Sequence, residues 1–274
     1  MAHQSQHDTK GSDGLEPGPS RHDGLPLQEE TVHRLNMGML LQTAGSMLGL
    51  PQQVLLTAAI FMQRFYAKRS RVTFEPEFIV STCLYLASKL EDFPRRISDV
   101  VNVIHRLQHA PAERPIPSAI DKLSGRSKSQ SEDTDLPAVL TGKAYYHAKD
   151  RLIKYEQSIL RAADFKVDIE QPHKYLLLYC RTIRASQALT QLACGALNDC
   201  IVYTSLYLRY PPAILAGGAL NFAVLLLEVA QDMPPEWWLP LNLDMSLLAS
   251  IGDELVDMYN NVPAKLVTEE GELE

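Results

Sequence analysis

The sequence has few cysteines, a deficit of basic residues and no long uninterrupted apolar run, and each shortage excludes a class of protein. Only 4 of its 274 residues are cysteine, and none of them belongs to a Cys-x-x-Cys pair. The sequence therefore predicts neither a structural zinc site nor a disulfide framework, and it fits a reducing compartment. The 26 Lys and Arg residues against 33 Asp and Glu residues give a formal charge of -7. Nucleic-acid phosphates and anionic lipids do not attract such a molecule as a whole, so a general DNA-binding role is disfavoured.

The chain shows neither an export signal nor a membrane span in its sequence. Its amino terminus is polar and rich in Gly, Pro, Ser and His, where a signal peptide needs an apolar stretch. The most apolar segment, Ala213 to Val229, contains Asn221 and Glu228. Its uninterrupted part is shorter than the roughly 20 apolar residues that a bilayer requires. We therefore expect a buried core helix there and no interaction with a membrane.

Apolar residues in helical spacing are what the sequence does contain. Hydrophobic residues make up 46% of the chain, enough for one large or two modest domains. Their i, i+4, i+7 spacing predicts amphipathic helices, and no segment alternates as a strand does, so the expected fold is all-α. Two segments, Pro76 to Leu90 and Pro212 to Leu227, are apolar on every face and are predicted to be buried on all sides. The other predicted helices begin near Pro51, Pro94, Lys143, His173, Leu189 and Leu243.

Composition also predicts where the domains begin and end. Residues 1–29 are rich in Gly and Pro and are expected to form a disordered tail. A first domain at 30–168 contains a long loop at 108–142, which holds several prolines and a serine-rich stretch. A second domain is expected at 169–262, followed by an acidic tail at 263–274.

The two most apolar helices are similar in sequence. The segment Phe74 to Ala87 aligns without a gap to Tyr210 to Ala223, an offset of 136 residues. The aromatic residue, a proline, an apolar pair, a leucine and an alanine coincide in the two segments. A repeat of this length with one central helix in each copy predicts two consecutive helical domains of the same design.

The residues after the first of these helices resemble a known family. The segment Leu86 to Leu107, which begins Leu-Ala-Ser-Lys-Leu-Glu-Asp-Phe-Pro-Arg-Arg, resembles the centre of the first cyclin box in transcription- and splicing-linked cyclins of the L type. Gln63 to Tyr66, Arg114 to Pro117 and Pro172 to Tyr179 also resemble the L-type cyclins and the related Q-type cyclins, also called M-type. The resemblance covers about Val32 to Asn260.

This resemblance implies two consecutive five-helix cyclin boxes and a regulatory subunit with no catalytic activity, cofactor or metal. Such a subunit forms a heterodimer with a cyclin-dependent serine/threonine kinase and activates it. The L-type likeness implies a nuclear role in RNA polymerase II transcription or RNA processing, without direct nucleic-acid binding. The alternative is a cyclin-box scaffold of the general transcription factor type that binds polymerase or promoter DNA. The charge of -7 and the missing zinc ribbon count against that alternative.

The resemblance also indicates which residues contact the kinase. The family's kinase-contacting lysine lies in the Ala-Ser-Lys motif, which places it at Lys89, and its partner in the fifth helix of the first box is Glu156. Charged hydrogen bonds from such a pair to backbone groups orient two proteins more than they add affinity. The expected kinase-binding residues are Lys89, Glu156, Glu91, Asp92, Arg95 and Arg96.

The repeat supplies a separate argument for Lys89. At the offset of 136 residues Lys89 matches Leu225, and Glu91 matches Leu227. The copy that only has to fold uses leucine there, so the fold does not require a charge, and the lysine indicates a functional surface. The alternative is that the helix reaches the surface at its end, where a lysine extends its amine into water.

Arg95 and Arg96 follow Pro94 at a predicted helix start. The amino-terminal end of a helix is the positive end of its dipole and gives cations no benefit. The pair is therefore either a docking patch for acidic or phosphorylated segments of a partner or a solvated rim, and both interpretations stay open.

His105 and His109 are spaced i, i+4 and could share a metal ion. No third ligand is evident in the sequence, and the first histidine is not followed by the glutamate of a metalloprotease motif. We therefore expect a solvated helix end rather than a metal site.

Overall fold

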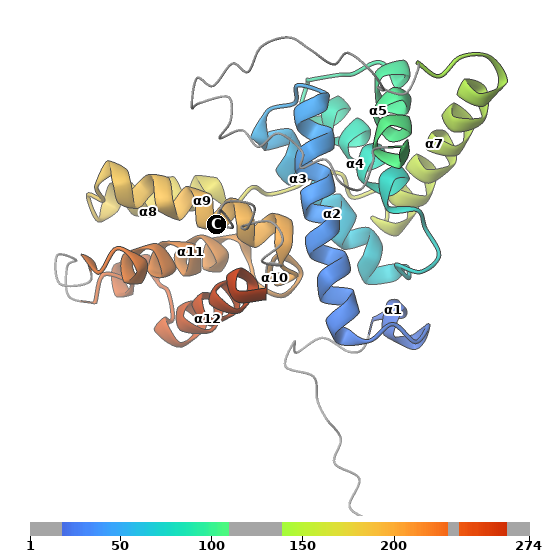
Figure 1. The fold of residues 1–274 in the computed structure, drawn as a ribbon. Helices are drawn as coiled ribbons and strands as arrows, with labels where there is room; N and C mark the ends of the chain where they lie inside the picture. The colour runs from blue at the N-terminus through green and yellow to red at the C-terminus, as the bar shows by residue number, and fades with distance from the viewer. Residues whose placement is uncertain (1–17, 110–138, 230–235, 262–274) are drawn as a thin grey trace, which may run out of the picture.

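The computed structural model describes residues 18–109, 139–229 and 236–261, and every regular element in these ranges is a helix (Figure 1). This confirms the predicted all-α class. The α-helices are α1 (Pro19–His22), α2 (Leu27–Met47), α3 (Gln52–Lys68), α4 (Pro76–Leu90), α5 (Ile97–His109), α7 (Gly142–Ala162), α8 (His173–Thr182), α9 (Gln187–Tyr203), α10 (Leu206–Arg209), α11 (Pro212–Leu226) and α12 (Met245–Asn261). A short 3-10 helix, η2 (Leu239–Leu241), precedes α12.

Part of what the sequence predicts falls outside these described residues. That part comprises the tail at 1–17, most of the proline- and serine-rich loop at 110–138, and the acidic tail at 263–274. None of the helices in the described ranges is both long enough and apolar enough to cross a membrane.

The helices form two bundles, each built around one apolar helix. In the first bundle α4 packs against α2, α3, α5 and α7. In the second bundle α11 packs against α8, α9 and α12, with the short α10 beside it. Figure 1 shows the first bundle in blue to yellow-green and the second in yellow to red. The predicted pair of domains of one design is therefore present as two bundles with equivalent central helices.

The two central helices match over their whole length. Each has 15 residues, each begins with a proline in its first turn, and Pro212 follows Pro76 at the offset of the repeat. Each ends before a residue with left-handed backbone, Asp92 with φ 60° and Glu228 with φ 55°. Aspartate tolerates this conformation better than most residues. The left-handed backbone at Asp92 turns the chain so that the amide of Phe93 donates to the carbonyl of Ser88 at 2.8 Å, as at many helix ends.

The prediction that both central helices are buried on all sides is wrong for their last residues. Leu90 is 39% exposed, and Leu225 and Leu226 are each 59% exposed. Leu227, which the sequence placed inside the helix, follows its last residue and is 39% exposed. The apolar pattern indicates a core helix correctly, but it does not show where such a helix leaves the core.

The predicted disordered tail at 1–29 is contradicted from Pro19 onward, because α1 and the start of α2 occupy this region. Ser20 is 1% exposed, and its hydroxyl accepts a hydrogen bond from the amide of Arg71 at 3.0 Å. The carboxylate of Glu30 lies 3.3 Å from Arg21 Nε and 3.7 Å from Arg71 Nε. The two contacts of Arg71, with Ser20 and with Glu30, reach across 51 and 41 residues of sequence, so local composition does not reveal them.

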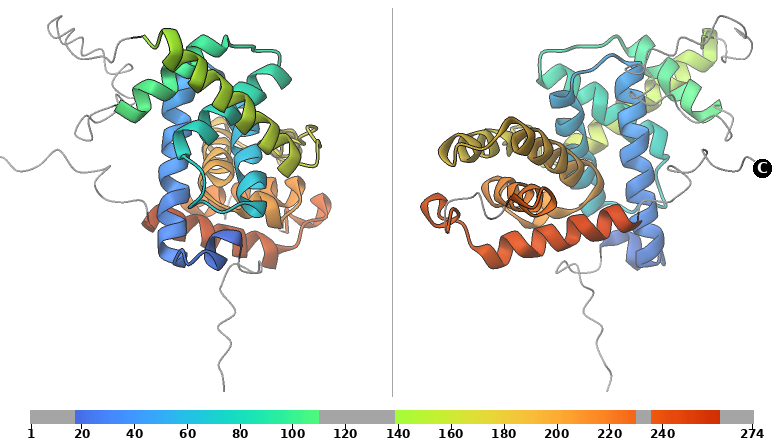
Figure 2. Two further views of the ribbon diagram at one scale, coloured as in Figure 1. Left: turned by 90° about the vertical axis from the view of Figure 1, so that its right-hand side faces the viewer. Right: turned by 60° about the vertical axis from the view of Figure 1, so that its left-hand side comes forward.

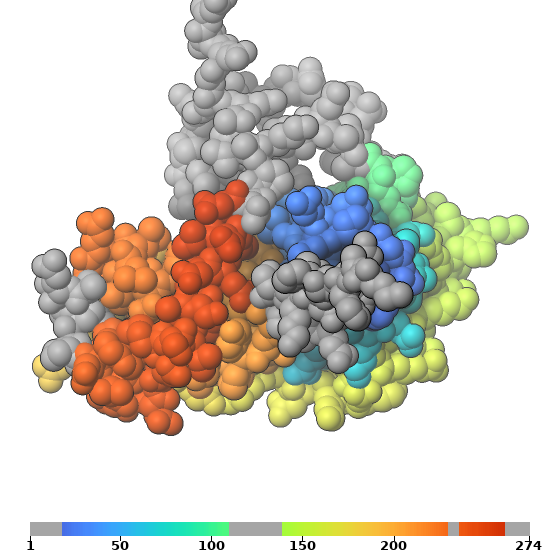
Figure 3. Space-filling model, turned by 90° about the horizontal axis from the view of Figure 1, so that it is seen from below, coloured from blue at the N-terminus to red at the C-terminus, as the bar shows by residue number. Residues whose placement is uncertain are grey.

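The two bundles lie side by side, with α2 and α3 packed against α9 (Figure 2). A side chain at Gly38 of α2 would place its Cβ 2.5 Å from Cδ1 of Tyr203, so the glycine permits the close approach. The Gln63 side-chain amide also donates to the carbonyl of Ile201 across this interface. Seen from below, α12 and the amino-terminal helices of the first bundle share one face of the molecule (Figure 3).

Candidate functional site

The structure brings Lys89 and Glu156 together at one edge of the first bundle. Lys89 lies in the last turn of α4, Glu156 lies on α7, and the lysine ammonium forms an ion pair with the Glu156 carboxylate. The ammonium also lies 4.3 Å from the ring centroid of Tyr85, where an aromatic face attracts a cation. The Lys89 side chain is 37% exposed and that of Glu156 is 17% exposed. The two residues that were expected to act together therefore form one ion pair that is accessible to a partner.

The second copy differs from what the repeat predicts at this position. Leu225, the equivalent of Lys89, is 59% exposed, so the second copy does not bury a leucine where the first has a lysine. Both helices reach the surface at this point. What distinguishes the first copy is that its residue is held by a carboxylate from a neighbouring helix of the same bundle.

Glu91 lies two residues beyond Lys89, but its carboxylate is engaged inside the first bundle. One carboxylate oxygen accepts a hydrogen bond from the hydroxyl of Thr57 at 2.6 Å, and the other accepts one from the Gln53 side-chain amide. Both donors belong to α3. Asp92 is exposed and holds the left-handed position that ends α4. Both residues therefore have a structural role within this chain that requires no contact with a partner.

Arg95 has a role within the chain that is neither a docking patch nor a solvated rim. Its guanidinium donates to the carbonyls of Leu48 at 2.7 Å and Gly49 at 2.6 Å, just beyond the end of α2. The carboxyl-terminal end of a helix is the negative end of its dipole, so a cation is favourable there. Arg96, in contrast, is exposed, and its side chain makes no hydrogen bond or ion pair with any residue that the structure describes. The two arginines thus have different surroundings.

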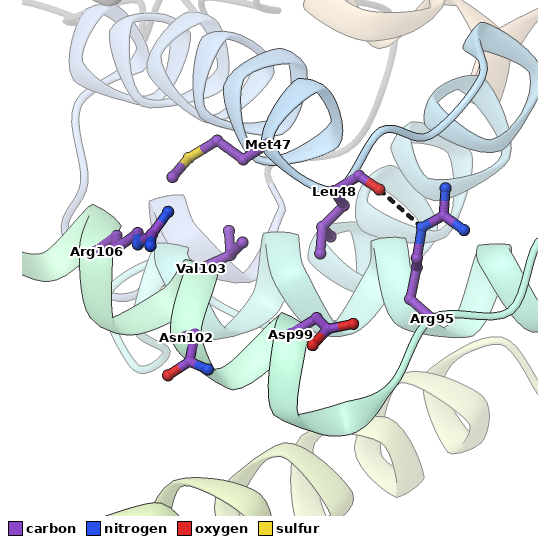
Figure 4. A pocket seen from close by; sticks show the side chains of 7 residues that line it. All are labelled: Met47, Leu48, Arg95, Asp99, Asn102, Val103 and Arg106. Carbon is purple, nitrogen blue, oxygen red and sulfur yellow. Dashed lines mark hydrogen bonds between the residues drawn. The ribbon is translucent and has the colours of Figure 1, made fainter. Parts of the chain in front are cut away.

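A shallow groove lies between the end of α2 and α5 (Figure 4). Leu48 and Val103 supply apolar lining from its two sides, and Arg95 and Arg106 lie at opposite ends of it in the view of Figure 4. The groove has a volume of about 450 Å³. The residues that line it are Met47, Leu48, Arg95, Asp99, Asn102, Val103 and Arg106. The lining includes neither member of the Lys89 pair.

The two histidines of α5 lie with their ring centroids 4.3 Å apart. Burial and the neighbouring His109 lower the pKa of His105, which favours an uncharged ring at neutral pH. Among the residues that the structure describes, no group of three or more His, Cys, Asp or Glu side chains is arranged to hold a metal ion.

Sequence reasoning missed exposed apolar residues near the ends of α4 and α7. Leu90 and Phe93 flank the end of α4 and are 39% and 43% exposed, and Phe165, after α7, is 66% exposed. Asp164 and Phe165 both have left-handed backbone, with φ 52° and 57°, and Asp164 pairs with Lys68 at 2.6 Å. Exposed aromatic residues are enriched at protein interfaces. Hydrophobicity alone does not separate these side chains from the core, so the sequence held no signal for them.

Comparison with known proteins supplies the remaining observations. Residues 17–168 match the family model described as the cyclin N-terminal domain. Cyclin-L2 of Rattus norvegicus is 30% identical over 265 residues, which cover 96% of this chain and 47% of the relative. Cyclin-L1 of Xenopus laevis is 33% identical over 228 residues, 82% of this chain and 42% of the relative. The chain therefore spans less than half the length of these relatives.

Solved structures of low sequence identity have the same fold. A chain in the crystal structure of the yeast RNA Pol II CTD kinase CTDK-1 complex matches with a TM-score of 0.67 and 17% identity, over 86% of this chain and 68% of that chain. A chain in the yeast TFIIK (Kin28/Ccl1/Tfb3) complex matches with a TM-score of 0.56 and 17% identity, over 87% of this chain and 89% of that chain.

Proposed function

Because this chain belongs to the cyclin family, we propose that it binds and activates a cyclin-dependent serine/threonine kinase that acts in RNA polymerase II transcription or RNA processing. Members of this family are regulatory subunits without catalytic activity of their own. The L-type relatives, and the structural likeness to a subunit of a polymerase II CTD kinase complex, support a transcriptional kinase in the nucleus. The kinase supplies ATP binding and chemistry, so the proposal gives this chain no cofactor.

The observation that carries the proposal is the Lys89–Glu156 pair at the accessible end of α4. An ammonium offers three donors and a carboxylate offers several acceptor sites, so the pair can hold each other and still bond a partner's backbone. Glu156 and the Tyr85 ring hold Lys89 in place before a partner arrives, which reduces the entropy lost on binding. Leu90 and Phe93 add exposed apolar surface next to the pair.

The test is charge reversal at the pair. Lys89→Glu or Glu156→Arg should weaken kinase binding by at least about 30-fold, because each leaves a desolvated like-charge contact at the interface. Helical circular dichroism and the melting temperature should change little, since a partly exposed ion pair contributes no more than about 1 kcal/mol to folding. The readout is the kinase recovered with the tagged full chain, identified by mass spectrometry.

Two further variants make this test specific. The double variant Lys89→Glu with Glu156→Lys restores an ion pair within the chain. It exchanges the positions of the positive and the negative charge at the surface, so kinase binding should stay lost. Lys68→Glu is the matched control, because Lys68 forms an exposed ion pair with Asp164 at 2.6 Å that includes neither member of the Lys89 pair, and this change should not affect the kinase. Recovery of the kinase by the double variant would reduce the pair to a structural role. Capture of polymerase or promoter DNA without a kinase would favour the scaffold alternative.

A further inference from the structure

A chain of hydrogen bonds runs from the segment between the two bundles to the end of α4. The Gln171 side-chain amide donates to the hydroxyl oxygen of Thr57 at 2.8 Å, and that hydroxyl donates to the Glu91 carboxylate at 2.6 Å. Gln53 donates to the other oxygen of the same carboxylate. We name the series Gln171–Thr57–Glu91 the relay.

The direction of every bond in the relay is fixed by chemistry. An ionised carboxylate only accepts, so the single proton of the Thr57 hydroxyl goes to Glu91, and the hydroxyl oxygen is left to accept from Gln171. Bonds arranged head to tail polarise one another, and the carboxylate at the end makes the last bond charge-assisted. Thr57 is 1% exposed, so in the intact chain water does not compete with either of its partners.

The relay ends in the part of α4 that carries the candidate site. Glu91 caps α4, and its amide donates to the carbonyl of Ala87 at 2.9 Å. Lys89 lies between these two residues in the last turn. Because the Glu91 side chain is held on α3, the last turn of α4 has a fixed position relative to the rest of the first bundle, and Lys89 is fixed with it.

The other end of the relay belongs to a segment that is held by the second bundle. Gln171 is followed directly by Pro172, which caps α8. The preceding residue, Glu170, has its carbonyl bonded by the Tyr207 hydroxyl at 3.1 Å and its carboxylate bonded by the Tyr175 hydroxyl at 2.7 Å. A displacement of the second bundle therefore moves the donor of the relay.

We propose that the relay positions Lys89 for kinase binding and makes that position depend on the second bundle. Glu91 is then a positioning residue that acts through Lys89, and not a residue that contacts the kinase. The second bundle has no counterpart at the end of α11, because the residue equivalent to Glu91 is Leu227, which is 39% exposed. This inference rests on the proposed function, and it adds a role for the interface between the bundles.

The first experiment needs no partner. Thr57→Val removes the hydroxyl, keeps the shape, and changes a side chain too buried to contact another protein. Hydrogen exchange of the free full chain should show the Phe93 amide exchanging about three- to tenfold faster, since the last turn of α4 opens more often. Gln171→Leu should act in the same direction with a smaller effect, because the Thr57–Glu91 bond survives. Thr82→Val is the matched control, because the Thr82 hydroxyl is equally buried on α4 but donates within that helix to the carbonyl of Phe78.

The second experiment uses the kinase that copurifies with the wild-type chain. Thr57→Val should weaken its binding by about three- to tenfold, and Thr82→Val should not. In a Lys89→Ala background the Thr57→Val loss should disappear, because a positioning residue has no effect once the residue it positions is absent. A merely structural role would give the same loss in both backgrounds.

The outcomes separate this inference from the proposed function. Equal losses in both backgrounds, or unchanged exchange of the Phe93 amide in Thr57→Val, would overturn the relay. If Lys89→Ala itself leaves kinase binding unchanged, the proposed contact fails, and with it the relay's role in kinase binding, whatever the exchange rates show. Faster exchange together with a Lys89-dependent loss of binding supports both.

Discussion

The ends of α4 and α11 occupy equivalent places in the two bundles but are built differently. At the end of α4, Lys89 is paired with a carboxylate from α7, and Glu91 is bonded to two side chains of α3. At the end of α11, Leu225 and Leu226 are each 59% exposed. The same backbone plan therefore ends in an ordered polar site in one copy and in exposed apolar side chains in the other. The difference shows that the polar groups of the first copy are not a requirement of the fold.

In the middle of the two helices it is the second copy that has the more tightly constrained residue. In α11 a Cβ added to Gly218 would lie 2.5 Å from Cγ2 of Ile251 on α12, so this helix is fixed by close backbone packing. The equivalent residue in α4 is Thr82, which is fully buried and bonds within its own helix. The second bundle thus depends on the packing of α11 against α12, whereas the first leaves room for side chains at this position.

The largest effect is expected when the residue of the first copy is placed in the second. Gly218→Thr forces three additional heavy atoms against Ile251 and should lower the free energy of unfolding by about 3 kcal/mol. Chemical denaturation of the full chain measures this loss. Gly195→Ala in α9 is the control, because nothing lies within 4 Å of its added Cβ, and it should stabilise by about 0.5–1 kcal/mol. A stable Gly218→Thr variant would show that α11 and α12 can separate without cost.

The fold could be predicted where local pattern and packing agree. The predicted bounds of α4 match the structure because Pro76 begins an apolar run and Asp92 supplies a left-handed stop. The single turn α1 was missed because contacts such as Ser20 with the Arg71 amide hold it, and those lie far away in the sequence. Apart from the end of the amino-terminal tail, the proposed domain boundaries stay predictions. Local propensity cannot show an element whose stability comes from distant residues.

The candidate site was predictable only in part, for the same reason. The family resemblance identified Lys89 and Glu156, and the structure brings the two together. It did not show that Arg95 bonds the carbonyl of Leu48, or that Glu91 bonds Thr57, because these partners lie 47 and 34 residues away. A charge in a motif therefore predicts that a residue has a partner, but it does not predict whether that partner belongs to the same chain.

A smaller effect is expected at a partly buried position where the copies differ in charge. Asp199 of α9 is the equivalent of Gln63 in α3, and its carboxylate accepts a hydrogen bond from the Tyr259 hydroxyl at 2.7 Å. Burial raises the pKa of Asp199 above its ordinary value of 3.8, and the bond from Tyr259 opposes this only in part. The folded chain therefore binds the proton more tightly than the unfolded chain. The resulting stability is complete below the ordinary pKa and is lost as pH rises through the raised pKa.

Asp199→Asn tests this difference, because it keeps an acceptor for Tyr259 and removes the charge. The variant should be more stable than the wild type by about 0.5–1 kcal/mol at pH 7, and this advantage should vanish near pH 3. Urea unfolding at the two pH values measures both. Asp244→Asn should behave in the opposite way, because hydrogen bonds from Ser246 lower the pKa of Asp244. An advantage of Asp199→Asn that does not depend on pH would exclude the charge as its cause.

The smallest effect is expected at the end of α11, at the position equivalent to Lys89. Leu225→Lys gives the second copy the residue that the first has at Lys89. Because Leu225 is 59% exposed, and because the lysine stem covers much of the same apolar surface, the free energy of unfolding should change by less than about 0.5 kcal/mol. Kinase recovery should be unchanged as well, since the proposed contact uses α4 and α7. A loss of more than about 1 kcal/mol would show that the second copy needs leucine at this position in order to fold. In that case the lysine of the first copy would again stand out as a residue that the fold does not explain.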